Sequence, residues 1–277
     1  MIEIFNLVKK FKGGKTAVND LTFSIGCNEI FGILGANGAG KTTLIRLLTM
    51  QLHPTSGKIF YNGKSLAENE TEIKNLIGVV PQHLNFDQEL NVAENLELHA
   101  RLYGMKNFDA RIAEMLEYVE LSEFANYSVK KLSGGMKRRL LIARALIHNP
   151  QIIFMDEPTV ALDPQVRRRI WNLIEELRKG GATIILTTHY IEEAEKLCQN
   201  IAMLKNGKLI AVDSPKNFCE RLGNFTVEFE NVGDNSHKFF FDKISAENYA
   251  ANFETAKIRK TTLEDVFVEL IANDKFS

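Results

Sequence analysis

The spacing of apolar residues along this chain predicts short strands and helices in alternation. In the first part of the sequence the apolar runs are short, rich in branched and aromatic side chains, and separated by turn-forming residues. One stretch is instead long enough and apolar enough for a buried helix. We expect strands at 2–7, 21–25, 29–34, 58–61 and 77–80, and a helix at 43–50.

The middle of the chain changes to the spacing of helices. Within residues 92–119, Ile112, Leu116 and Val119 recur at the i, i+4 and i+7 positions of one helix face. A further helix is expected at 140–147, where nearly every residue is apolar, so that helix should be buried. We interpret this region as a helical insertion into an α/β core.

Strands and helices alternate again after the insertion. The apolar run at 152–155 has the composition of a buried parallel strand, and another strand is expected at 182–187. Between them, Asp163 and Pro164 provide the N-cap and the first residue of a helix that ends at the glycine pair 180–181. The pattern therefore predicts an α/β fold built on a mixed sheet.

The last part of the chain differs in composition. Asn206-Gly207 predicts the turn of a hairpin, and after about residue 222 the alternating runs at 225–229 and 238–241 predict antiparallel strands. Thr262 and Asp265 resemble a capping box at the start of a final apolar-faced helix, with Leu263, Val266, Phe267, Leu270 and Ile271 on its buried side. We expect a small α+β appendage, which is too short to be stable alone.

The composition is that of an ordinary globular protein. Apolar residues make up 45% and charged residues 25% of the 277 residues, and the net charge is −1. A charge near zero argues against a dedicated nucleic-acid-binding protein. Cys27, Cys198 and Cys219 are far apart, which argues against a zinc site and for a reducing compartment. Apolar runs fall short of the roughly 20 residues of a membrane helix, so any membrane role should depend on a partner chain.

Residues 35–43, Gly-Ala-Asn-Gly-Ala-Gly-Lys-Thr-Thr, match the phosphate-loop pattern G-x-x-x-x-G-K-[ST]. The loop stands between a predicted strand and a predicted helix, the context in which this pattern binds phosphate, and this context argues against a simple glycine-rich turn. Lys41 would bring positive charge to the β- and γ-phosphates, and Thr42 is placed to bind Mg²⁺. We expect nucleotide contacts from Gly35, Asn37, Gly38, Ala39, Gly40, Lys41, Thr42 and Thr43.

Two carboxylates, Asp156 and Glu157, follow the strand at 152–155. Parallel sheets bind their ligands at the carboxyl ends of the strands. We therefore expect Asp156 to hold Mg²⁺, directly or through water, and Glu157 to accept a proton from an attacking water. A solvated acidic turn is the alternative, and it is a poor explanation for a carboxylate pair that accompanies a phosphate loop.

The stretch Leu132-Ser133-Gly134-Gly135-Met136 precedes the apolar helix at 140–147. Ser-Gly-Gly alone usually indicates a turn with a serine cap. Here the cap, the exposed glycine N–H groups and the helix dipole together favour a second anion site, formed by Ser133, Gly134 and Gly135.

In their order along the chain, these motifs resemble those of the ATP-binding subunits of ABC transporters. Gln82 matches the glutamine of the Q-loop, and Leu132-Ser133-Gly134-Gly135-Met136 match the signature motif. Ala161-Leu162-Asp163 match the D-loop, and His189 matches the switch histidine. Phe11 stands where the family has an aromatic side chain that stacks on adenine.

The resemblance implies a P-loop NTPase core and assigns roles to residues. Residues 1–222 would form the ATPase domain, with a helical subdomain at about 86–149 that carries the signature motif, and 223–277 a C-terminal accessory domain. The catalytic residues would be Glu157, His189 and Gln82, and the Mg²⁺ ligands Thr42, Gln82 and Asp156. Asp163, Ser133, Gly134, Gly135 and Phe11 would join the phosphate loop in binding nucleotide.

Two positions depart from the family pattern. Met136 replaces the usual signature glutamine, and Val160 replaces a Ser or Gly before the D-loop. Methionine favours a helix start, and Ser133 and Gly135 are present, so we expect activity to be retained. Lys137-Arg138-Arg139 and the ending at 262–267 are similar to exporters of the daunorubicin-resistance and nodulation-factor type.

Some residues keep a simpler explanation beside the functional one. His189 could be a solvated cap and Gln82 a turn residue, although the accompanying motifs favour phosphate sensing in both cases. Phe11 is nearly as consistent with a core position as with adenine stacking. A patch of Phe86, Leu90 and Val92 could receive a partner's helix or pack under its own loop. A solvated helix face explains most of the basic group Lys130, Lys131, Lys137, Arg138, Arg139 and Arg144, with attraction of ATP or anionic lipid as lesser alternatives.

The resemblance implies an ATPase that uses ATP and Mg²⁺, dimerises head to tail with an identical or homologous chain, and powers translocation through a separate membrane permease, with export favoured. It would be cytoplasmic and peripheral on the inner face of the cell membrane, without a nucleic-acid partner. The alternative is a soluble ABC-type ATPase that acts on nucleic acid or ribosomes. The very long coiled-coil insertion or second cassette of such proteins is absent from this sequence.

Overall fold

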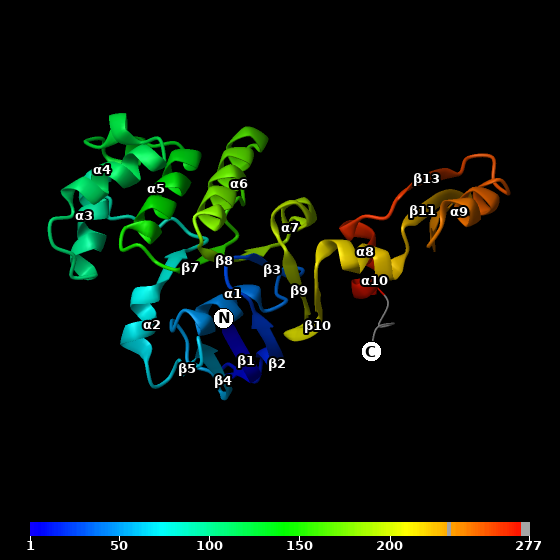
Figure 1. Ribbon diagram of the computed structural model, residues 1–277, viewed down its shortest axis with the longest axis horizontal. Coiled ribbons are helices and arrows are strands. Elements are labelled where there is room, and N and C mark those ends of the chain that lie inside the picture. The colour runs from blue at the N-terminus through cyan, green and yellow to red at the C-terminus, as the bar shows by residue number, and fades with distance from the viewer. Residues whose placement is uncertain (232–233, 273–277) are drawn as a thin grey trace.

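The computed structural model of the protein describes residues 1–231 and 234–272, whose strands form three sheets (Figure 1). The largest sheet is mixed, as predicted: its strands lie in the order β10-β9-β3-β8-β7-β6, and all neighbours are parallel except the β9–β10 hairpin. β3, β7 and β8 are buried along their length, so their sequences show continuous apolar runs instead of alternation. The strands are β3 (Ile30–Leu34), β6 (Ile77–Val80), β7 (Ile152–Asp156), β8 (Thr183–Thr188), β9 (Asn200–Lys205) and β10 (Lys208–Asp213).

A second, antiparallel sheet lies beside the first, in the order β2-β1-β4-β5. Helix α1 (Lys41–Leu48) contributes Leu44 and Leu47 to a buried cluster that also includes side chains of both sheets. This packing fixes the start of α1, and therefore the phosphate loop, against the strands. The remaining elements are β1 (Ile2–Lys10), β2 (Thr16–Ile25), β4 (Ser56–Tyr61), β5 (Lys64–Ser65) and α2 (Glu70–Leu76).

The predicted helical stretch at 92–119 is two helices, α3 (Val92–Leu102) and α4 (Asp109–Tyr118). Gly104 and Asn107, both with positive φ, lie in the turn between them. α3 starts at a capping box of Asn91 and Glu94. Two short 3₁₀ helices, Ser122–Phe124 and Val129–Lys131, lead to α5 (Gly134–Leu146), which begins before the predicted 140–147 because Ser133 caps it.

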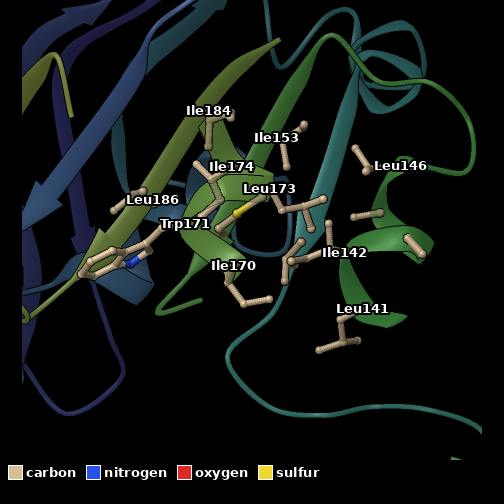
Figure 2. Close-up of a cluster of buried hydrophobic side chains, with 14 of the residues drawn as sticks. Leu141, Ile142, Leu146, Ile153, Ile170, Trp171, Leu173, Ile174, Ile184 and Leu186 are labelled. Carbon is tan, nitrogen blue, oxygen red and sulfur yellow. The ribbon is translucent and has the colours of Figure 1, made fainter. Parts of the chain in front are cut away.

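The helices pack on the large sheet through one buried cluster. α5 and α6 (Pro164–Lys179) both contribute side chains to this cluster, including Ile142 of α5 and Ile174 of α6, together with Ile153 of β7 (Figure 2). α6 begins, as predicted, with Asp163 as N-cap and Pro164 as its first residue. α7 (Ile191–Leu197) directly follows the histidine at the end of β8. Among the described residues, no helix is both long enough and apolar enough to cross a membrane.

The C-terminal part contains the expected antiparallel strands and lies at one end of the molecule (Figure 1). Val227 and Phe229 of its sheet form a small cluster with Ala246, separate from the large cores. α8 connects this part to the hairpin strand β10 of the large sheet. The elements are α8 (Pro215–Leu222), β11 (Phe225–Asn231), β12 (Asp234–Phe240), α9 (Lys243–Ala250), β13 (Lys257–Lys260) and α10 (Leu263–Ala272).

The last helix, α10, packs against the core instead of only against its own sheet. Its Leu263, Val266 and Leu270 are buried in the same cluster as Phe218 of α8; Phe267 is partly buried there, and the Ile271 side chain lies outside the described ones. The expected contact of Thr262 with Asp265 is present, because the Asp265 carboxylate accepts hydrogen bonds from Thr262 N–H (2.8 Å) and Oγ1 (2.9 Å). The boundary at 222/223 stays a prediction, but α10 is shared between the two parts.

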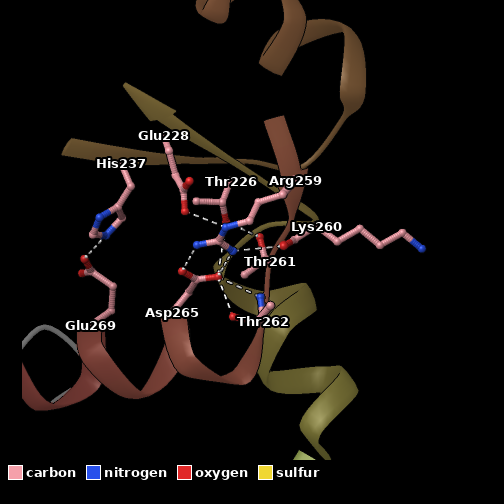
Figure 3. A network of polar contacts seen from close by, with 9 residues as sticks. All are labelled: Thr226, Glu228, His237, Arg259, Lys260, Thr261, Thr262, Asp265 and Glu269. Atoms are coloured by element: carbon pink, nitrogen blue, oxygen red, sulfur yellow. Dashed lines mark hydrogen bonds and ion pairs between the residues drawn. The ribbon is translucent and has the colours of Figure 1, made fainter. Parts of the chain in front are cut away.

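Arg259 joins the C-terminal sheet to α10. Its guanidinium donates two hydrogen bonds to Asp265 (2.6 and 2.7 Å) and one to Glu228 (2.7 Å), as Figure 3 shows. Burial acts to raise the pKa of Asp265, but the hydrogen bonds from Arg259 and Thr262 and the positive charge of Arg259 hold it below its usual value. Arg259 thus connects the C-terminal sheet to α10, the helix that packs on the core.

Substitution of Leu263 tests whether α10 belongs to the core. Leu263 is fully buried, so we expect Leu263→Ala to lower the free energy of unfolding by about 2–5 kcal/mol, through lost apolar contact and a residual cavity. Urea unfolding measures the change. Val268→Ala, on the same helix but 47% exposed, is the control and should change stability by less than about 0.5 kcal/mol. Equal effects of the two substitutions would mean that α10 does not pack as described.

Candidate nucleotide-binding site

The phosphate loop has the backbone conformation that a phosphate cradle requires. Gly40 caps α1 with φ +107°, and the cap supplies no side-chain hydrogen bond, so the first N–H groups of α1 are left for a ligand. A side chain at Gly40 would come within 2.3 Å of the Ala17 carbonyl oxygen, and one at Gly35 within 2.6 Å of the Leu204 carbonyl oxygen. At Gly38, with φ +83°, the space is open. The glycines are therefore needed both for conformation and for close packing.

Lys41 lies almost buried at the base of this loop. Its ammonium donates hydrogen bonds to the carbonyl oxygens of Gly35 (2.7 Å) and Ala36 (3.2 Å) and lies 3.8 Å from Glu157. Burial lowers the pKa of Lys41 from its usual value, and the charges of Glu157 and Asp156 act in the opposite direction. A bound triphosphate would supply further negative charge and offset the cost of burying the ammonium.

Thr42 and Asp156 meet at the carboxyl end of β7. The Thr42 hydroxyl donates to Asp156 Oδ1 at 3.2 Å, and Thr187 Oγ1 donates to the same oxygen at 2.6 Å. A hydroxyl and a carboxylate are hard oxygen donors of the kind that bind Mg²⁺ together with water and nucleotide phosphates. These donors fit the predicted Mg²⁺ site, with Thr187 holding the carboxylate in place.

Glu157 is buried, and it lies beside Thr187 and His189 at the end of β8. Its N–H donates to Thr187 Oγ1 (3.0 Å) and to the Thr187 carbonyl (3.2 Å), and its backbone has φ +49°. His189 Nδ1 lies 3.1 Å from Glu157 Oε2, without the alignment of a hydrogen bond. The structure therefore brings Lys41, Thr42, Asp156, Glu157 and His189 together, although 148 positions separate the first and last of them in the sequence (189 − 41).

The Q-loop is attached to α5 by a buried arginine. Arg138 donates to the carbonyl oxygens of Pro81 (2.8 Å) and Gln82 (3.0 Å). Burial lowers the pKa of Arg138, while the charges of Asp156 and Glu193 raise it. Only the backbone of Gln82 is held in this way. The Gln82 side chain has no hydrogen bond among the described contacts, so its assignment to Mg²⁺ and the γ-phosphate stays a prediction.

The interpretation of the basic group around the signature as a solvated face is wrong for its arginines. Arg138 and Arg144 are 4% and 6% exposed, and Arg144 donates to the carbonyl and side-chain oxygens of Asn85. Arg139 donates to the Val119 carbonyl at 2.7 Å. Buried arginines of this kind satisfy backbone carbonyls of loops that have no regular partners. Lys130 and Lys131 are exposed, as that interpretation requires.

The signature residues lie apart from the phosphate loop of their own chain. Ser133 Oγ accepts a hydrogen bond from Met136 N–H (3.2 Å), and Gly134 is exposed with open space at its Cα. A side chain at Gly135 would meet Val166 of α6 at 2.7 Å, close to Asp163, whose carboxylate caps α6. Among the described residues, no hydrogen bond or ion pair joins Ser133, Gly134 or Gly135 to the phosphate loop.

Side-chain exposure decides between the alternative interpretations of Phe11 and of the hydrophobic patch. Phe11 is 40% exposed at the β1–β2 turn, with the Lys9 ammonium 5.6 Å from its ring, so it is not a core residue. Phe86 and Val92 are buried in the main cluster, so they pack under their own loop and do not form a docking patch. The exposed apolar side chains in this region are instead Leu84, Leu98 and Leu102.

Sequence patterns did not reveal several residues that shape the site. Thr187 holds Asp156 and Glu157, and the only sequence signal was its position at a strand end before His189. Arg138 and Arg144 hold the Q-loop, but arginines on a helix give no sign of which backbone they will meet. Glu193 is buried but gives no sequence signal, because a glutamate in a charged helix start is usually solvated.

Comparisons with known proteins give consistent matches. The family model described as ABC transporter matches residues 18–160. A Nod factor export ATP-binding protein I of Rhizobium sp. (strain N33) is 46% identical over 215 residues, or 77% of this chain and 71% of that protein. The corresponding protein of Rhizobium etli is 37% identical over 295 aligned positions, 98% of this chain and 93% of that protein. A linearmycin resistance ATP-binding protein of Bacillus subtilis is 41% identical over 222 residues, with shares of 79% and 71%.

Solved structures show the same likeness. A dimeric ATP-binding cassette in a post-hydrolysis state, bound to ADP and Pi, is 31% identical, with a TM-score of 0.71 over 77% of this chain and 98% of that one. The ATP-binding subunit of an ABC transporter is 27% identical, with a TM-score of 0.72 over 80% and 92% of the two chains. The α/β fold predicted from the sequence pattern is thereby confirmed.

Proposed function

The chain belongs to the family of ABC transporter ATP-binding subunits and is an ATPase, and from this premise we propose that it dimerises on ATP and powers export through a separate membrane permease. The observation that carries the proposal is the buried assembly of Lys41, Asp156, Glu157 and His189 beside a glycine-rich helix start. The signature residues 133–135, at the start of α5, are the second part of the proposal, because they would bind the ATP held by a second chain.

Each residue of the assembly has one task in hydrolysis. The N–H groups at the start of α1 and the Lys41 ammonium bind the β- and γ-phosphates and stabilise the charge that develops there. Glu157 accepts the proton of the attacking water, and His189, 3.1 Å away, donates to the γ-phosphate. Gln82 contacts the same phosphate from the Q-loop, and Phe11, exposed at its turn, stacks on adenine.

Mg²⁺ supplies charge neutralisation and orientation of the phosphates. Thr42 and Asp156 would hold the ion, with Gln82 as a further ligand, and Thr187 keeps the Asp156 oxygen in position. In such sites the protein supplies only part of the Mg²⁺ coordination, and water and phosphate oxygens supply the rest. ATP hydrolysis should therefore disappear when EDTA is added and return with excess Mg²⁺.

A second copy, or a homologous chain, completes the site. Ser133, Gly134 and Gly135 stand at the N-terminus of α5, a helix end suited to an anion, yet within the described part of the chain no hydrogen bond or ion pair joins them to the phosphate loop. Head-to-tail pairing would place them on the γ-phosphate held by the partner, with Asp163 beside them because Gly135 packs on Val166. The dimeric state of a solved relative supports this arrangement.

The permease is proposed to contact the exposed face of α3. Leu98 and Leu102, four residues apart on that helix, are 39% and 71% exposed. Asn95 of α3 hydrogen-bonds Asp87 N–H (3.0 Å) and the Asp87 carbonyl (3.1 Å), so α3 is attached to the segment that follows Gln82. Force on α3 would therefore reach the nucleotide site. Relatives named for Nod factor export and linearmycin resistance favour export as the direction.

Cell fractionation tests the permease assignment. We expect the tagged chain, expressed in its native cells, to sediment with membranes, to be released by alkaline carbonate, and to co-elute after detergent extraction with a multi-span protein. Leu102→Glu should reduce membrane recovery about 10-fold without changing ATP hydrolysis by the purified chain, because it puts a charge in an apolar contact. Ile244→Glu, equally exposed at 70% on α9, is the control. A chain that sediments with ribosomes or DNA would favour the soluble alternative instead.

A further inference from the structure

Glu193, on α7, is a buried carboxylate that the roles assigned above do not use. It is 1% exposed, and its Oε1 accepts hydrogen bonds from Thr159 Oγ1 (2.7 Å) and from Trp171 Nε1 (2.8 Å). Its Oε2 is also buried and has no hydrogen-bond partner among the described residues. A buried carboxylate is costly unless its oxygens are well compensated, and an apolar side chain often serves stability as well or better. Stability alone is therefore a poor reason for this residue.

The segment that Glu193 holds contains the proposed base. Thr159 follows Glu157 by two residues, is fully buried, and directs its hydroxyl to Glu193. The turn that it belongs to includes two residues in the left-handed region, Glu157 (φ +49°) and Ala161 (φ +58°). Its internal hydrogen bonds, from Val160 N–H to the Glu157 carbonyl and from Leu162 N–H to the Thr159 carbonyl, are both 3.3 Å long. Such a conformation persists only where the surroundings impose it.

Two contacts connect this turn to the segment after β8. His189 lies 3.1 Å from the Glu157 carboxylate, and Glu193, four residues later on α7, accepts the Thr159 hydrogen bond. The two segments are thus joined at two neighbouring points. Through the same oxygen, Glu193 also accepts the hydrogen bond from Trp171 of α6. One carboxylate oxygen therefore joins the turn with the base to α6 and α7.

We propose that Glu193 is a positioning residue for ATP hydrolysis, which fixes the Glu157 turn through the Thr159 hydroxyl and orients it relative to His189. The proposal rests on the role of Glu157 as base given above. It needs no contact between Glu193 and nucleotide. Displacement of a base by about 1 Å can lower a rate about 10²-fold, so loss of this hydrogen bond acts on turnover more than on nucleotide binding.

Two substitutions that each remove one hydrogen bond from the same Glu193 oxygen provide a matched test. Thr159→Val removes the donor on the catalytic turn, and Trp171→Phe removes the donor on α6, within a packing cluster. We expect both to lower Tm, Trp171→Phe by more because the smaller ring also leaves a cavity in the buried cluster. Thr159→Val should also lower kcat about 10–100-fold with KM changed less than about 3-fold, whereas Trp171→Phe should keep kcat within about 2-fold.

Three further variants test whether the hydrogen bond itself carries the effect on turnover. Thr159→Ser keeps the hydroxyl and should restore most of kcat. Glu193→Gln keeps an oxygen that can accept both hydrogen bonds and should stay near the parental rate, while Glu193→Ala should reproduce the Thr159→Val kinetics. If Glu193→Ala does not fold, the comparison of Thr159→Val with Trp171→Phe still tests the positioning role of Glu193.

The proposal is overturned if Thr159→Val hydrolyses ATP at the parental kcat, or if Trp171→Phe loses as much kcat as Thr159→Val. It is also overturned if Thr159→Ser fails to restore turnover. Glu157→Gln separates this outcome from failure of the proposed function. If Glu157→Gln is inactive while Thr159→Val is fully active, only the positioning role is lost; if Glu157→Gln is fully active, the assignment of the base itself is wrong.

Discussion

Lys41→Ala is expected to abolish ATP binding and hydrolysis while the chain remains folded. Lys41 is the charged residue of the phosphate loop, and its ammonium lies 2.7 Å from the Gly35 carbonyl within the glycine cradle. Its removal takes away a charge aimed at the β- and γ-phosphates, and loss of one such group typically costs about 10²–10³-fold in rate. Fluorescent-nucleotide binding and phosphate release measure the two effects.

Two controls accompany this substitution. Lys41→Met keeps the apolar stem of the side chain and removes only the charge, so it separates lost electrostatics from lost packing. Lys179→Ala removes an exposed lysine at the end of α6 and should leave binding and turnover unchanged. Hydrolysis by Lys41→Ala at the parental rate would contradict the nucleotide site as we describe it.

Glu157→Gln is expected to stop hydrolysis and to trap an ATP-bound dimer. The substitution keeps the size of the side chain but removes its capacity to accept a proton, which should lower kcat about 10²–10⁴-fold. It also removes a negative charge 3.8 Å from the Lys41 ammonium, so ATP should bind at least as tightly as before. Unhydrolysed ATP bound between two chains stabilises their association by mass action. Size-exclusion chromatography with Mg-ATP should therefore show a dimer, whereas the parent should pair only transiently.

A second substitution tests which surfaces form the dimer. Ser133 is exposed at the N-terminus of α5, so Ser133→Arg places a bulky cation in the proposed interface without touching the core. The double variant Glu157→Gln/Ser133→Arg should elute as a monomer that still binds ATP. A Glu157→Gln protein that stays monomeric at saturating Mg-ATP, well above micromolar concentration, would argue strongly against head-to-tail pairing.

The motifs were predictable because each is local. The glycines, Lys41 and Thr42 form a contiguous loop whose chemistry depends on backbone conformation and helix start, both of which short sequence patterns report. Asp156 and Glu157 were found because a buried parallel strand shows a continuous apolar run that ends at its carboxyl edge. The sequence pattern does not show that 92–119 is divided into two helices, because helical spacing continues on both sides of the turn at Gly104.

Long-range contacts were not predictable in the same way. Phe86 and Val92 could have been a docking patch or a buried loop anchor, and the burial that decides between these depends on which elements cover them. Arg138 and Arg144 carry charges that usually lie in solvent, but here they satisfy carbonyls of the Q-loop more than 50 residues earlier in the chain.

The amino-acid sequence by itself determined the alternation of strands and helices, the phosphate loop, and the identity of the carboxylates and histidine at the ends of β7 and β8, because those properties depend on neighbours in the chain. Only the tertiary structure decided that Thr187 donates a hydrogen bond to Asp156, that Thr159 donates one to Glu193, and that α10 packs with the core. Each of these contacts joins residues from separate elements. Their geometry follows from strand order and helix packing, which no local pattern of residues encodes.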